Sequence, residues 1–66
     1  MNVVVNGEVR DVPAGSTAGD LVALLGLEGR PFAVEVNERV VPRMSLPDCT
    51  LSEGDRLEIV TLVGGG

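Results

Sequence analysis

The sequence predicts an α+β fold in which a mixed sheet of about five strands is covered on one face by one main helix. Three observations support this prediction. Short aliphatic runs recur along the chain, one segment shows leucines at helical spacing, and turn residues separate the segments. The 66 residues, of which 44% are hydrophobic, allow one small core and therefore one domain.

The first two strands are predicted to form a hairpin. Apolar residues 3–5 and 9–12 flank Asn6-Gly7, and Asn-Gly is a strong hairpin signal because both positions can take a positive φ. The sequence leaves open whether the loop has two or three residues, since Glu8 fits either the turn or the strand. Pro13 then ends the second strand.

The predicted helix begins near Thr17, which is a suitable N-cap. Asp20, three residues later, gives an aspartate version of the capping box. Gly26 fits the left-handed position just after a helix end. The face expected to lie on the sheet has i, i+3, i+4 spacing and consists of Leu21, Leu24 and Leu25.

Two more strands and an irregular crossover follow. Residues 32–37 alternate, so we expect Val34 and Val36 to face inward. A turn at Asn37-Glu38 leads to a short strand at residues 39–41. The crossover at residues 44–51 is predicted to contain one turn of helix and to place two leucines in the core, Leu46 and Leu51.

The last predicted strand covers residues 56–63. If Leu57, Ile59 and Thr61 face the helix, alternation places Val60 and Leu62 on the opposite, open face of the sheet. Two large apolar side chains on the open face of a small domain predict a surface for partner docking.

The predicted order is β-β-α-β-β-β. The first and last strands are the most aliphatic, so we expect them to be central and parallel to each other. This is the topology of the β-grasp fold. We predict a β-grasp domain at residues 1–63, followed by a flexible glycine tail at residues 64–66.

The charge and cysteine content exclude several classes of function. The net charge is −5, and neither lysine nor histidine is present, which makes nucleic acid an unsuitable partner and favours a partner with a basic surface. Cys49 is the single cysteine, so the chain can form no intrachain disulfide and lacks the ligands for a usual zinc site. No apolar run approaches the ~20 residues of a membrane helix, and no signal peptide is visible. We expect a cytoplasmic protein that is monomeric when free and binds neither membrane nor metal.

The glycine tail, Gly64, Gly65 and Gly66, predicts the reactive part of the molecule. A chain without side chains can enter a narrow slot, and three extended residues reach roughly 10 Å beyond the last strand. The chemical group at its tip is the carboxylate of Gly66. We therefore expect the tail to enter the active sites of partner enzymes, with Gly66 as the point of covalent modification.

Four stretches resemble the ThiS family of thiamine-biosynthesis sulfur carrier proteins, which are ubiquitin-like β-grasp proteins. These are residues 3–8, residues 33–37 with residues 40–43, residues 53–55, and Gly65-Gly66. The Val-Glu-Val-Asn and Val-Pro-Arg block is the most specific part. The terminal diglycine is shared by all ubiquitin-like sulfur carriers.

The resemblance implies that this chain is a substrate and carrier, with catalysis residing in its partners. An E1-like enzyme of the ThiF type would use ATP and magnesium to adenylate Gly66, and a persulfide sulfur donor would convert it to a thiocarboxylate. Thiazole synthase of the ThiG type would then take the sulfur. No cofactor would be bound by the chain itself.

Several alternatives remain open from the sequence. One is a sulfur carrier for molybdopterin or for tRNA thiolation; the former type is usually longer and richer in aromatic residues, whereas this chain has only Phe32. A ubiquitin-like protein modifier that conjugates through Gly66 is another. A non-catalytic interaction module with an inert tail is a third, and it alone should tolerate removal of Gly66.

Overall fold

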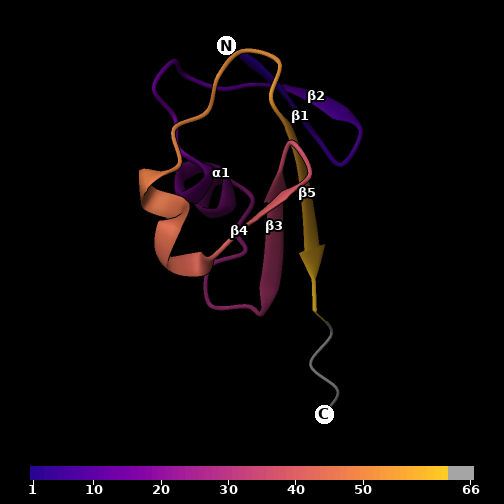
Figure 1. Cartoon of the computed structure of the whole chain (residues 1–66), viewed down its shortest axis with the longest axis vertical. Helices are drawn as coiled ribbons and strands as arrows, with labels where there is room; N and C mark the ends of the chain where they lie inside the picture. The colour runs from indigo at the N-terminus through magenta and orange to yellow at the C-terminus, as the bar shows by residue number, and fades with distance from the viewer. Residues whose placement is uncertain (63–66) are drawn as a thin grey trace.

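The computed structural model describes residues 1–62, which form one mixed sheet with a helix against it (Figure 1). Within these residues the order of elements is β1 (Asn2–Val5), β2 (Glu8–Asp11), α1 (Ala18–Leu24), β3 (Phe32–Val36), β4 (Arg39–Val41), the 3-10 helix η1 (Arg43–Asp48) and β5 (Arg56–Thr61). The strands lie in the order β2-β1-β5-β3-β4. β1 and β5 are internal and parallel, as predicted, and the other neighbours are antiparallel.

The hairpin at the start of the chain has a two-residue loop. Val5 pairs with Glu8, so only Asn6 and Gly7 form the turn, and both have positive φ values of 50° and 84°. This geometry suits the right-handed twist of the flanking strands. The question that the sequence left open, two residues or three, is therefore settled in favour of two.

Helix α1 confirms the predicted cap but corrects the predicted face. Thr17 accepts a hydrogen bond from the Asp20 backbone N–H, and the Asp20 carboxylate accepts one from the Thr17 N–H. Leu24, however, is 64% exposed, so its predicted place on the sheet is wrong. At about 100° per residue, the buried stripe runs through Ala18, Leu21, Val22 and the half-buried Leu25, and Leu24 falls well outside it.

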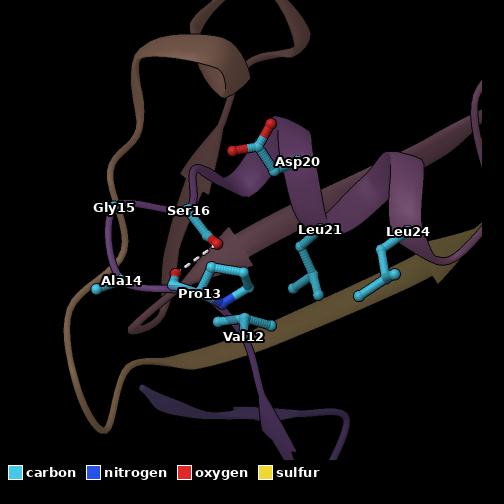
Figure 2. A pocket seen from close by; sticks show the side chains of 8 residues that line it. All are labelled: Val12, Pro13, Ala14, Gly15, Ser16, Asp20, Leu21 and Leu24. Atoms are coloured by element: carbon cyan, nitrogen blue, oxygen red, sulfur yellow. Dashed lines mark hydrogen bonds between the residues drawn. The ribbon is translucent and has the colours of Figure 1, made fainter.

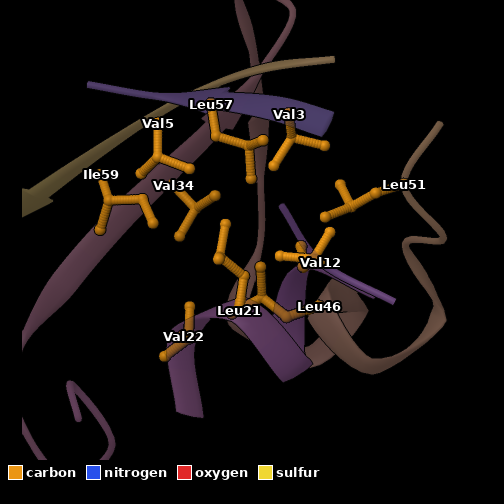
Figure 3. Packing of buried hydrophobic residues seen from close by; sticks show 11 residues of the cluster. Val3, Val5, Val12, Leu21, Val22, Val34, Leu46, Leu51, Leu57 and Ile59 are labelled. Carbon is orange, nitrogen blue, oxygen red and sulfur yellow. The ribbon is translucent and has the colours of Figure 1, made fainter. Parts of the chain in front are cut away.

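The core lies between the sheet and the helical segments (Figure 3). Leu57 and Ile59 of β5 are buried in it, as predicted, whereas Thr61 at the end of that strand is exposed. Leu46 and Leu51 of the crossover are also buried, which confirms their prediction. Gly19 allows η1 to lie close to α1, because a Cβ at this position would be 3.3 Å from backbone atoms of η1.

Candidate functional site

The candidate site consists of the end of β5 and the tail that follows it. The predicted tail residues, Gly64, Gly65 and Gly66, lie outside residues 1–62, as does Val63, so their roles stay predictions. The segment just before them is well defined. On the β3 side, Val60 pairs with Ala33, and the Leu62 N–H donates a 2.9 Å hydrogen bond to the Pro31 carbonyl. The point from which the tail starts is thus attached to the sheet.

On its other side, β5 is held by a side chain. The Asn6 amide donates from Nδ2 to the Ile59 carbonyl at 3.1 Å and accepts from the Ile59 N–H through Oδ1 at 2.8 Å. From the sequence, Asn6 was interpreted as a turn residue only. Asn-Gly is explained by the turn alone, so no local signal pointed to a partner 53 residues away.

The face of the sheet opposite α1 carries the predicted docking residues together with other exposed apolar and charged side chains. Val60 is 55% exposed and Leu62 is 53% exposed, which confirms that they do not belong to the core. Strand pairing places Val9 and Val40 on this same face, and they are 68% and 71% exposed. We call Val9, Val40, Val60 and Leu62 the apolar patch. Its members do not form one continuous surface, because Val9 and Val40 lie on opposite edge strands and charged residues of the same face lie between them. Val9 and Val40 were not predicted, because each lies on an edge strand with no strong alternation.

Two acidic residues lie beside this patch. Glu35 of β3 pairs directly with Glu58 of β5, and both share the face of Val60 because side chains two residues apart point the same way. Arg56 lies two residues before Glu58 on the same face of β5, but the one ion pair within residues 1–62 joins the N-terminal amine of Met1 to Asp11. Like charges opposite each other in a sheet are destabilising. A basic group from a partner would remove this repulsion.

The opposite side of the molecule offers a different surface. A shallow pocket of about 330 Å³ lies between the residues after β2 and the start of α1, and Leu21 and Leu24 line it with Val12 (Figure 2). Its lining is mostly apolar, and the carboxylate of Asp20 is already used in the helix cap. The Ser16 hydroxyl, which also lines the pocket, donates to the Pro13 carbonyl at 2.6 Å, so both polar side chains of the lining already have local partners.

The remaining reactive side chains are separated from one another. Cys49 is half buried and packs against the core. The Arg43 guanidinium lies over the Phe32 ring, 4.4 Å from its centre, and donates a hydrogen bond to the Arg30 carbonyl. These contacts connect Arg43 to the start of β3 and to the segment before it. Among residues 1–62, no three His, Cys, Asp or Glu side chains gather as metal ligands do. The longest helix in this range, α1, has seven residues, far fewer than a membrane span needs.

The geometry therefore presents two exposed apolar side chains, Val60 and Leu62, at the end of the described chain. Three comparisons relate the chain to known proteins. The model of the ThiS family matches residues 3–66. The sulfur carrier protein ThiS of Thermus thermophilus is 36% identical over 64 residues, which cover 97% of this chain and 98% of that protein. A thiazole synthase of Paramagnetospirillum magneticum is 42% identical over 66 residues, but this chain spans only 20% of its length.

The fold is shared as well. The crystal structure of the thiamine biosynthesis protein ThiS from Geobacter metallireducens superposes with a TM-score of 0.83 at 29% identity, over all of both chains. The five-stranded mixed sheet with its single main helix is thus the ubiquitin-like β-grasp fold. With a family match over residues 3–66, the chain belongs to the ThiS family, whose member in Thermus thermophilus is a sulfur carrier protein.

Proposed function

We propose that Gly66 carries sulfur as a C-terminal thiocarboxylate and delivers it to thiazole synthase. A carboxylate is a poor electrophile, so an E1-like enzyme of the ThiF type first joins it to AMP from ATP and releases pyrophosphate. That enzyme binds the ATP and magnesium. The terminal sulfur of a persulfide donor then bonds to the acyl carbon and AMP leaves. A thiol breaks the remaining S–S bond, which yields the thiocarboxylate and a disulfide.

The match of the family model over residues 3–66 carries this proposal, because it includes the glycine tail as well as the domain. The likeness of the whole chain to one fifth of a thiazole synthase supports the choice of acceptor. A carrier-like segment within a thiazole synthase is expected if the two act on the same sulfur. We place the reaction in the cytoplasm, where ATP is available to the activating enzyme.

We assign docking to the folded domain and placement of the reacting carboxylate to the tail. The apolar patch supplies surface to bury against the activating enzyme, whereas a glycine tail buries little surface and loses much entropy when it is ordered. Docking energy should therefore come chiefly from Val60, Leu62 and their neighbours. The tail then has only to place the carboxylate of Gly66.

Intact mass spectrometry tests this proposal. The protein is incubated with its activating enzyme, ATP, magnesium and a persulfide donor, and the replacement of one oxygen by sulfur should raise its mass by about 16 Da. Omission of ATP should prevent the change. A chain that remains unmodified in the complete mixture would falsify the carrier role.

The acceptor is tested in a second step. Addition of thiazole synthase and its other substrates should return the mass to that of the carboxylate. The large subunit of molybdopterin synthase, added in place of thiazole synthase, serves as the control and should leave the thiocarboxylate in place. Sulfur loss to molybdopterin synthase alone would assign the chain to the other pathway.

A further inference from the structure

The two edges of β5 are held by different means. On the β3 side, backbone pairing continues as far as Thr61, and the Leu62 N–H adds one more bond to Pro31. On the β1 side, strand pairing stops at Val5 with Leu57, because the chain turns away at Asn6-Gly7. β5 therefore extends past the end of its parallel neighbour.

The side chain of Asn6 continues the hydrogen bonding along the β1 side of β5. The Asn6 backbone N–H donates to the Leu57 carbonyl at 2.9 Å, and its side-chain amide then makes the two bonds to Ile59. A carboxamide has the same donor and acceptor as a peptide unit, so it replaces one residue of strand. Both side-chain bonds are partly buried, which reduces competition from water.

The position of these bonds relates them to docking. Ile59 immediately precedes Val60 and lies three residues before Leu62, the two β5 members of the apolar patch. Among residues 1–62, the Asn6 side chain makes the last hydrogen bonds to β5 on its β1 side, since none reaches Thr61 or Leu62 from there. Without Asn6, the final residues of β5 would be held on the β3 side alone.

We propose that Asn6 is a positioning residue that pre-organises the docking end of β5 for the activating enzyme. This inference rests on the proposed function, since it concerns the same docking step. A strand end that frays in the free protein must be ordered on binding. The apparent affinity then equals the intrinsic affinity multiplied by the fraction of molecules in which the strand end is ordered. Loss of Asn6 should therefore raise KM, and it should leave kcat nearly unchanged because the docked complex holds the strand in place.

The substitution Asn6→Gly tests this inference, because glycine keeps the positive φ of the turn and removes both side-chain bonds. Asn37→Gly is the matched control. Asn37 also has a positive φ, and its side chain also makes two bonds, to Asp55 and to the Arg56 N–H at the opposite end of β5. Asn6→Asp keeps the acceptor for the Ile59 N–H, but it replaces the donor by a carboxylate oxygen that repels the Ile59 carbonyl.

Two measurements are made on each folded variant: hydrogen exchange of the β5 amides, and kcat and KM for adenylation. Asn6→Gly should speed exchange at Ile59 and raise KM about fivefold to tenfold, the effect expected for one to two lost hydrogen bonds. Asn6→Asp should also raise KM. Asn37→Gly should speed exchange at Arg56 and leave KM at the parent value.

The outcomes separate this inference from the proposed function. An unchanged KM in Asn6→Gly and Asn6→Asp refutes the positioning role alone, provided that the parent is adenylated. An equal rise in KM for Asn37→Gly also refutes it, because the effect would then be general loosening of β5. A parent chain that is not adenylated at all refutes the proposed function, and the positioning role with it.

Discussion

Two asparagines in this small domain shape turns and also hold β5. Asn6 and Asn37 have φ values of 50° and 51°, a region that asparagine tolerates better than most residues. Each directs its side-chain amide to the backbone of β5, one near each end of the strand. Each asparagine thus bonds β5 with its side chain as well as with its backbone N–H, which donates to Leu57 from Asn6 and to Arg56 from Asn37.

Single residues also matter in the glycine tail, where Gly65→Val is the informative change. A β-branched side chain should obstruct a slot that fits bare backbone, so we expect the rate of the adenylation step to fall by about a hundredfold, as a misplacement of ~1 Å can cause. Docking should change little. Single-turnover adenylation and the dissociation constant for the activating enzyme are the two measurements. A variant that loses affinity and reacts normally once bound contradicts this assignment.

At the scale of elements, β5 combines two roles on its two faces. Leu57 and Ile59 fill the core, whereas Val60 and Leu62 are exposed on the opposite face. The same strand therefore stabilises the fold and presents the apolar patch. Because the side chains alternate, a change on one face can be made without disturbing the other.

Leu62→Asp tests the role of the exposed face. A charge placed at a contact that must lose water disfavours binding, so we expect the dissociation constant for the activating enzyme to rise about tenfold or more. The fold should persist, because Leu62 lies outside the core. Isothermal titration calorimetry gives the affinity, and circular dichroism checks the fold.

Leu24→Asp is the control for this prediction. Leu24 is similarly exposed but lies on α1, on the other side of the sheet, where it lines the pocket of Figure 2. It should bind as tightly as the parent. If Leu24→Asp weakened binding and Leu62→Asp did not, the docking surface would lie on the helix side of the molecule.

At the scale of the whole molecule, the net charge of −5 includes an acidic pair on the same face of the sheet as Val60. Glu35 and Glu58 are direct neighbours across β3 and β5, an arrangement in which like charges are generally destabilising. An arrangement that costs stability beside the apolar patch suits the recognition of a basic surface. The charge would then speed encounter with the partner.

Glu58→Gln should therefore change stability and association in opposite directions. Removal of the repulsion should raise the free energy of unfolding by about 0.2–1 kcal/mol. The association rate with the activating enzyme should fall severalfold at low salt, and the difference from the parent should shrink as salt is added. Thermal unfolding and stopped-flow mixing at two ionic strengths measure these effects.

Glu28→Gln provides a control with the same change in net charge. Glu28 lines a groove beside Phe32 and Leu46, between α1 and η1, and so lies away from the docking face. Its association rate should remain close to that of the parent. Equal slowing in both variants would show that net charge, rather than the position of Glu58, governs encounter.

Much of this architecture could be predicted from the sequence, because its signals are local. Asn6-Gly7 specifies a tight turn, the cap between Thr17 and Asp20 starts the helix, and alternation along β5 separates Ile59 from Val60. In each case the interacting groups lie within a few residues of one another. The predicted order of strands followed from these elements and from the aliphatic character of the first and last strands.

Only the tertiary structure decided which of these residues meet across the sheet. Leu24 has the spacing of a buried leucine, yet α1 is oriented so that Val22 takes that place in the core. The register of β3 with β5 brings Glu35 to Glu58, and the meeting of β1 with β5 brings Asn6 to Ile59. Such pairs depend on how separate elements pack against one another. The local sequence patterns used to predict helices and strands therefore contain no information about them.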